Sequence, residues 1–301
     1  MKDPRVERTR YHNLNDIIFI AIAAVLSGAE SWNEIEFYGE MKEDWLKEVL
    51  ELPNGIPSHD TFNRLFSALD ADEFERCFLN WIKSVNEITK GEVISIDGKT
   101  IRGSKKLGFK SATHIVSAWA DKNELVLGQI KVDEKSNEIT AIPKLLENLL
   151  IKDCVVTIDA MGCQKKIARK IVSKQADYIL AVKENQKELF EDIQDSFRVL
   201  EPSDSSEDID YGHGRIETRK CFVLTDLSLF EEALKWKGLT SIIKIERERY
   251  FKATGKKETE ASYYIISLKY ALLINSGVRK HWGIENKVHW LLDVAFNEDQ
   301  S

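Results

Sequence analysis

The stretch VISID at residues 93–97 is a short apolar run that ends in an acidic residue, and CVVTID at residues 154–159 repeats the pattern. Short runs rich in Val and Ile predict buried β-strands. An aspartate at one strand end is usually a turn or cap residue. On two neighbouring strands, however, Asp97 and Asp159 would lie side by side and repel each other. Close carboxylates are tolerated around a divalent cation such as Mg²⁺, so the pair predicts a two-metal site for phosphodiester chemistry.

The segments around these two runs predict an alternation of strands and helices. From residue 91 the expected order is three strands, a helix, a strand, a helix and a strand. This order favours a mixed α/β sheet with helices on its faces. The further predicted elements are strands at His114–Ala120, Glu124–Val132 and Tyr178–Val182, and helices at Glu138–Leu150, Gln164–Ser173 and Gln186–Leu200.

Residues from about 201 to 270 predict an inserted β-rich region. The acidic, serine-rich stretch Glu201–Asp210 predicts a loop. Strands are then expected at His213–Leu224, Ser241–Arg249 and Tyr263–Leu268. A last helix is expected from Gly277 to Leu292, shortly before the chain ends.

Residues 1–90 predict a small helical domain, and residues 91–301 predict a second, larger domain. A helix, a glycine-containing turn and a second helix carrying Arg64 could read DNA. The alternative is a domain that only packs. Because residues 1–90 hold 10 basic and 17 acidic residues, their net charge favours packing over DNA reading.

The composition of the 301-residue chain is that of an ordinary globular protein, with 43% hydrophobic and 31% charged residues. Its longest apolar run, Ile17–Leu26, is shorter than the ~20 residues that a membrane-spanning helix needs. Four scattered cysteines indicate neither a disulfide framework nor a zinc ribbon, and they favour the cytoplasm. The net charge of −7 disfavours a nucleic-acid partner, but residues 91–301 hold 33 basic and 33 acidic residues, so local basic clusters matter more.

Basic residues follow both aspartates closely. Single basic faces usually mean only contact with water, but two basic runs beside two carboxylates suggest that phosphates approach the same edge of the sheet. The predicted phosphate contacts are Lys99, Arg102, Lys105 and Lys106 after Asp97, and Lys165 and Lys166 after Asp159.

The predicted last helix carries His281, Glu285 and His289 at i, i+4 and i+8, so the three side chains are expected on one face. Glu285 could be the third metal ligand, with Arg279, His281 and Lys287 near it as DNA contacts. A zinc site is the alternative, but the HExxH spacing is absent. An ordinary solvated polar face also fits the pattern.

The stretch YGHGRIETR at residues 211–219 combines aromatic, basic and acidic residues with a period of two. One continuous strand would place His213, Arg215 and Arg219 on the same face. These side chains would then contact phosphates near the site, or they would form an ordinary polar edge strand.

Several long motifs resemble the H-repeat-associated insertion-sequence transposases. The strings are GEVISIDGKTIRGS, EKSNEITAIPKLL, VVTIDAMGCQ, ILAVKENQ, YGHGRIETR and VRKHWGIENKVHWLLDVAFNED, and the helical region adds SGAESWNEIEFYGE and LPNGIPSHDTFNRLF. The resemblance implies a ribonuclease-H-like fold and a DDE triad, which falls on Asp97, Asp159 and Glu285. It also implies two Mg²⁺ or Mn²⁺ ions, DNA as the partner, and an inserted β-rich region before the glutamate.

Two features depart from the pattern of related transposases. Many carry a Tyr-x2-Arg-x3-Glu-x6-Lys signature, whose positions here hold Val278, His281, Glu285 and Leu292. Similar proteins also continue past FNED with a basic helical tail, so a truncated C-terminus is expected at Ser301.

The sequence favours the first of three possible functions. The first is a DNA transposase that cleaves and joins DNA, expected in the cytoplasm at the nucleoid and as a homodimer or larger assembly on DNA. The second is a two-metal nuclease without strand transfer. The third is an inactive, truncated relative that only binds DNA or a full-length partner.

Overall fold

The computed structural model describes residues 1–85, 90–105, 112–133, 136–212, 214–228, 230–268, 277–281 and 283–299, without the side chains of Thr9, Lys83, Val85 and Lys105. The chain forms two compact units. The helical unit comprises Met1–Asn86 and Leu291–Glu298. The sheet unit comprises Glu87–Trp290 and Asp299–Ser301.

The helical unit is built on an apolar cluster in which Ile17, Phe62 and Leu65 are fully buried. Ser31 begins the second helix with a capping box, in which its side chain and that of Glu34 bond each other's backbone N–H groups. The stretch from Trp32 to Val49 forms two helices, which are divided at Lys42. The helices are α1 (Leu14–Leu26), α2 (Trp32–Met41), α3 (Glu43–Val49), α4 (His59–Ala68) and α5 (Ala71–Val85).

The sheet unit has a mixed α/β architecture around one nine-stranded sheet of order β3-β2-β1-β4-β5-β9-β8-β7-β6. The predicted sequence of three strands, helix, strand, helix and strand is confirmed. Its elements are β1 (Val93–Ile101), β2 (Thr113–Ala120), β3 (Leu125–Lys131), α6 (Glu138–Asn148), β4 (Val155–Ile158), α7 (Lys165–Ser173), β5 (Asp177–Val182) and α8 (Lys187–Val199).

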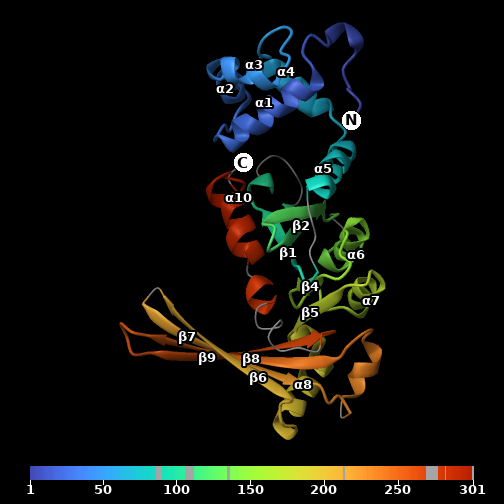
Figure 1. The fold of residues 1–301 in the computed structure, drawn as a ribbon, viewed down its shortest axis with the longest axis vertical. Coiled ribbons are helices and arrows are strands. Elements are labelled where there is room, and N and C mark those ends of the chain that lie inside the picture. Colours follow the sequence, from blue (N-terminus) through green and yellow to red (C-terminus); the bar gives the residue numbers. More distant parts are fainter. Residues whose placement is uncertain are drawn as a thin grey trace. The chain divides into compact units, whose positions relative to one another are not determined.

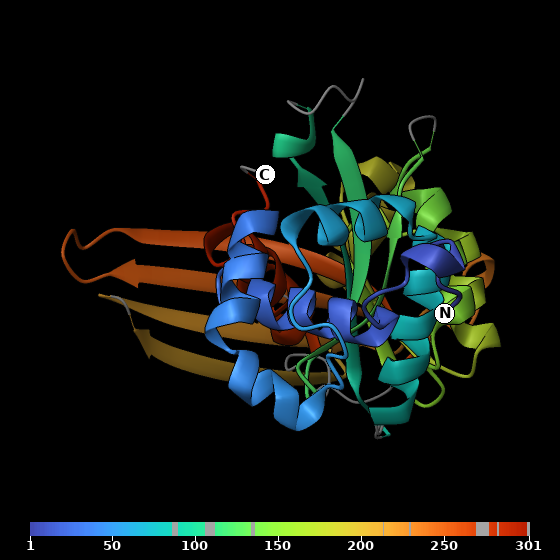
Figure 2. The same cartoon turned by 90° about the horizontal axis from the view of Figure 1, so that it is seen from above.

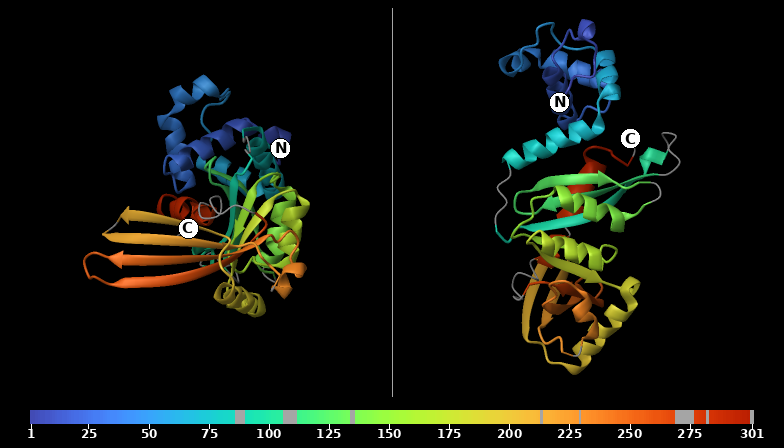
Figure 3. Two further views of the ribbon diagram at one scale, coloured as in Figure 1. Left: turned by 60° about the horizontal axis from the view of Figure 1, so that its bottom comes forward. Right: turned by 90° about the vertical axis from the view of Figure 1, so that its right-hand side faces the viewer.

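The β-rich region continues the same sheet, because β9 pairs antiparallel with β5. The strands are β6 (Asp204–Gly212), β7 (Arg215–Leu224), β8 (Ser241–Phe251) and β9 (Lys257–Ile266). Their outer ends project beyond the other strands of the unit, as Figures 2 and 3 show. One sheet thus includes both the central strands and the protruding hairpins β6–β7 and β8–β9.

Two sequence predictions in this region are wrong. The stretch predicted as a loop, Glu201–Asp210, is mostly strand β6, which lies at the sheet edge and pairs only with β7. Such a strand buries neither face and needs no apolar pattern. The predicted single strand through YGHGRIETR is instead a hairpin, because β6 ends at Gly212 and Gly214 adopts a φ of +73°.

Helices cover both faces of the central strands, with α6 and α7 on one face and the helical segment from residue 277 on the other (Figure 1). Residues 277–281 of that segment are helical, and Ile284–His289 (η5) is a π-helix, followed by α10 (Trp290–Val294). The predicted regular helix Gly277–Leu292 is therefore interrupted by a wider turn. No helix in the described part of the chain is long and apolar enough to cross a membrane.

Candidate active site

Asp97 and Asp159 lie on neighbouring parallel strands, as the sequence predicts. The pairing of β1 with β4 ends at Ile96↔Ile158, so the two aspartates follow the last paired residues. Asp159 does come directly after its strand. Asp97, however, lies within β1, because β1 continues to Ile101 through antiparallel pairing with β2. The prediction that Asp97 ends its strand is therefore wrong.

The carboxylate of Asp159 is oriented by the turn that follows β4. Its Oδ1 accepts hydrogen bonds from the backbone N–H groups of Met161 (3.0 Å) and Gly162 (3.2 Å). Both bonds use the same oxygen, so they fix the carboxylate plane without engaging Oδ2.

The three predicted carboxylates interact electrostatically. Burial, together with the smaller effects of the charges of Asp159, Glu285 and Glu138, raises the pKa of Asp97 to about 7, against a hydrogen bond from the Gly98 backbone that lowers it. Burial and the charge of Asp159 also raise the pKa of Glu285, whereas Lys183 lowers it. Even so, no three Asp, Glu, His or Cys side chains in the described residues form a group that could hold a metal ion.

The two histidines of the last helical segment both turn toward the sheet. Nδ1 of His281 lies 3.1 Å from Oγ1 of Thr157, and burial lowers the pKa of His281. Nδ1 of His289 lies 3.6 Å from a carboxylate oxygen of Asp97. His281 is thus engaged inside the unit, which favours a packing role over the predicted DNA contact.

The basic residues predicted after Asp97 are placed only in part. Lys99 is buried in β1 and lies 3.7 Å from Asp299. Arg102 is exposed, and both its backbone N–H (3.0 Å) and its guanidinium (3.7 Å) contact the same Asp299. Lys106 and the side chain of Lys105 lie outside the described residues.

Of the basic residues predicted after Asp159, Lys165 pairs with Glu232 at 3.1 Å. Lys166 is exposed in the first turn of α7. His213, predicted as a phosphate contact together with Arg215 and Arg219, lies outside the described part of the chain.

Four other predicted cations meet in one cavity of about 540 Å³, here called the basic pocket. Arg215 and Arg219 come from β7, and Arg279 and Lys287 come from the last helical segment. Two arginines of β8, which the sequence did not single out, complete it. The full lining is Asp121, Arg215, Glu217, Arg219, Arg247, Arg249, Arg279, Lys280, Gly283, Asn286 and Lys287.

Glu217 organises the arginines of this pocket. Its carboxylate is buried and lies 3.7 Å from both Arg215 and Arg249, and it also bonds Arg219. One carboxylate thus forms ion pairs with three guanidinium groups. Arg219 and Arg247 are direct cross-strand partners, and each also pairs with a carboxylate, Arg219 with Glu217 and Arg247 with Glu260.

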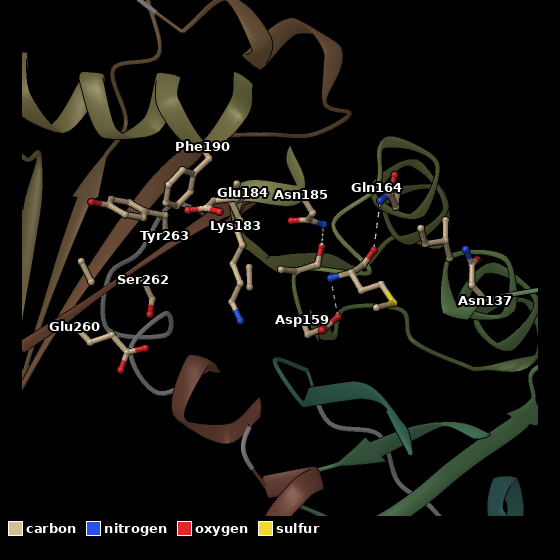
Figure 4. A pocket seen from close by; sticks show the side chains of 16 residues that line it. Asn137, Asp159, Gln164, Lys183, Glu184, Asn185, Phe190, Glu260, Ser262 and Tyr263 are labelled. Carbon is tan, nitrogen blue, oxygen red and sulfur yellow. Dashed lines mark hydrogen bonds between the residues drawn. The ribbon is translucent and has the colours of Figure 1, made fainter. Parts of the chain in front are cut away.

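A second cavity, of about 910 Å³, borders Asp159. Figure 4 shows Phe190 and Tyr263 at one end and Asn137 at the other, with Lys183 and Asp159 between them. Lys183 directly follows β5, which is parallel to β4, so it reaches the same edge of the sheet as Asp159. The sequence predicts a strand at Tyr178–Val182, so the position of Lys183 directly after it could have indicated a place beside Asp159.

Two family models match the chain. The first, described as DDE_Tnp_1-associated, matches residues 1–82, and the second, described as Transposase DDE domain, matches residues 88–301. The chain belongs to the DDE transposase family.

The proteins to which the chain is similar are also named as transposases. The chain is 45% identical to "Putative transposase YncI" of Escherichia coli O157:H7 over 298 residues, which cover 96% of this chain and 76% of that protein. It is 43% identical to "H repeat-associated putative transposase YhhI" of Escherichia coli strain K12, with 96% and 79% covered. The predicted kinship with H-repeat-associated transposases is thereby confirmed. Among solved structures, Streptomyces venezuelae DesVI matches with a TM-score of 0.20 and 7% identity over 42% of this chain and 49% of that one, too little to bear on the fold.

Proposed function

We propose that this DDE transposase mobilises a bacterial insertion sequence by cutting and joining DNA, with Asp97, Asp159 and Glu285 as its catalytic triad. The observation that carries the proposal is the placement of Asp97 and Asp159, which follow the last paired residues of the neighbouring parallel strands β1 and β4. Burial and the charges of Asp159, Glu285 and Glu138 raise the pKa of Asp97, which supports a gathering of carboxylates at this place. Carboxylates that disfavour one another's charge are stabilised by a cation between them. The strand order β3-β2-β1-β4-β5, with β1, β4 and β5 parallel, supports a ribonuclease-H-like core.

The donor set fits Mg²⁺ or Mn²⁺, because all three ligands are hard carboxylate oxygens. Asp97, Asp159 and Glu285 would together hold the two ions. Two bound ions would activate the attacking hydroxyl and stabilise the leaving oxygen. The turn after β4 already orients Asp159 for such a role.

In the proposed reaction, water attacks the phosphodiester at the end of the element, and the freed 3′-hydroxyl then attacks target DNA. Each step is an in-line displacement at phosphorus. Lys99 and Arg102, near Asp97 in sequence, would neutralise a phosphate once Asp299 releases them. The basic pocket would hold the DNA backbone through charge, independently of base sequence. We expect this reaction in the cytoplasm at the nucleoid, carried out by a homodimer or larger assembly on DNA.

A strand-transfer assay tests this function. Labelled DNA from the end of the element is incubated with a plasmid target and Mg²⁺ or Mn²⁺. Asp97→Asn should reduce joined products on the order of 10³-fold or more, as expected when a principal catalytic group is lost. Asp195→Asn is the matched control, because Asp195 is an exposed residue of α8 that pairs with Arg198.

The alternatives give different products in the same assay. Asp97-dependent cleavage without joining would identify a two-metal nuclease. DNA retention without cleavage or joining would identify an inactive DNA-binding relative. Joining that persists in Asp97→Asn would contradict the proposed triad.

A further inference from the structure

Ser95, Thr157 and His281 form a hydrogen-bonded chain that links all three elements carrying the proposed triad. Ser95 lies two residues before Asp97 on β1, and Thr157 lies two residues before Asp159 on β4. Residues two apart in a strand share a face, so the hydroxyl of Ser95 lies on the same side of β1 as Asp97. Asp159 directly follows β4. His281 comes four residues before Glu285. Each carboxylate therefore has one member of the chain within four residues of it in the sequence.

The donors in this chain follow one another in a single direction. Oγ of Ser95 donates to the backbone carbonyl of Lys280 at 3.3 Å, and Oγ1 of Thr157 donates to Oγ of Ser95 at 3.2 Å. Each hydroxyl has one proton to give, so Thr157 accepts from Nδ1–H of His281 at 3.1 Å. The path leaves the helical segment at His281, crosses two strands and returns to the same segment at Lys280.

These hydrogen bonds fix the orientation of the helical segment more closely than apolar packing does. Ile284 and Val288 of this segment are buried, but apolar contacts tolerate small rotations and shifts of a helix. Hydrogen bonds are directional and fix both position and rotation. Ser95 and Thr157 are almost wholly buried, so breaking one bond would leave a polar group without water.

We propose that the Ser95–Thr157–His281 chain is a positioning device that holds the helical segment, and with it Glu285, in a fixed place relative to Asp97 and Asp159. The inference rests on the proposed function in that it treats these three as metal ligands. His281 and Thr157 act through the carboxylates and are positioning residues.

The test compares variants that remove one bond with variants that keep it. Thr157→Val removes the hydroxyl, whereas Thr157→Ser retains it. His281→Leu removes the ring nitrogen, whereas His281→Asn keeps a nitrogen near the position of Nδ1. Ser196→Ala is the control, because Ser196 is a buried residue of α8 whose hydroxyl donates to the carbonyl of Asp192 in the same helix.

Two measurements are made on each full-length variant. Hydrogen exchange of the metal-free protein measures how firmly residues 283–290 are held. Calorimetry measures the affinity for Mn²⁺, which depends on how the three carboxylates are arranged. Thr157→Val and His281→Leu should speed exchange in that segment on the order of tenfold and weaken Mn²⁺ binding about 10–100-fold, the scale found when groups behind metal ligands are lost. Thr157→Ser, His281→Asn and Ser196→Ala should resemble the wild type.

Unchanged exchange in Thr157→Val and His281→Leu would overturn the inference, as would faster exchange with unaltered Mn²⁺ affinity. The same would follow if Ser196→Ala behaved like Thr157→Val, since the effect would then be general destabilisation. A wild type without Asp97-dependent Mn²⁺ binding would instead contradict the proposed function. The exchange measurement would still decide whether the chain holds the helix.

Discussion

Gly98 follows Asp97 in β1, and two polar side chains lie close over its backbone. Nε2 of His114 is 2.7 Å from a carboxylate oxygen of Glu138, and Nδ1 of the same ring is 2.8 Å from Oγ1 of Thr100. A Cβ atom at position 98 would lie 2.6 Å from Nε2 of His114 and closer still to the Glu138 carboxylate. Only glycine lets this pair lie beside Asp97.

Gly98→Ala should therefore destabilise the protein by about 1–3 kcal/mol, because the added methyl group displaces the Glu138–His114 pair. Urea denaturation measures the change. Gly212→Ala is the control, since a Cβ there meets nothing within 4 Å. In a Glu138→Ala background the cost of Gly98→Ala should shrink; an equal cost in both backgrounds would show that the pair is not what the methyl group displaces.

Single residues were predictable where chemistry coincides with a local pattern. Asp97 and Asp159 stand out because apolar strand residues lead up to them. Glu138 lies 41 positions after Asp97, and it contacts Gly98 only because Thr100 pairs with His114 and α6 begins nearby. No local pattern contains that information.

At the scale of elements, the β7–β8 pairing concentrates positive charge. It sets Arg219 opposite Arg247 and Glu217 opposite Arg249. Arg219→Gln and Arg249→Gln should each weaken binding of a duplex oligonucleotide and lower the slope of log K against log salt by about 1. Fluorescence anisotropy in EDTA measures binding without catalysis. Lys256→Gln, an exposed hairpin change outside the basic pocket, should leave the slope near that of the wild type. Equal slopes in all variants would remove this pocket from the DNA path.

Helices and strands that bury many apolar side chains could be predicted from the sequence, and those that bury few could not. Strands β1, β4 and β5 are apolar because both their faces are covered, and the sequence shows them plainly. The edge strand β6 buries almost nothing, so it has the composition of a loop. The π-helix η5 closes i→i+5 hydrogen bonds and so has a wider turn than an α-helix, and the local residue pattern does not reveal where such a turn occurs. The arginines of β8 join those of β7 only through non-local pairing.

At the scale of the whole molecule, the chain returns at its end to the unit where it began. Residues Leu291–Glu298 cluster with the helical unit, and the side chain of Asn297 bonds that of Glu30. A chain ending after Trp290 should thus lower the melting temperature of the helical unit by about 4–8 °C, as expected for a loss of about 1 kcal/mol in a unit of this size. Calorimetry resolves this transition from that of the sheet unit. A chain ending after Glu298 is the control, and an unchanged transition in the shorter chain would contradict the prediction.

The composition of β6 also bears on how copies of the protein meet in concentrated solution. A sheet edge presents unpaired backbone groups that can recruit another strand, which is a common route to aggregation. Four of the nine residues of β6 are acidic: Asp204, Glu207, Asp208 and Asp210. Two such edges approaching each other would bring eight carboxylates together, and these would repel. The acidic residues that hide β6 in the sequence therefore also oppose the pairing of β6 with the sheet of a second molecule.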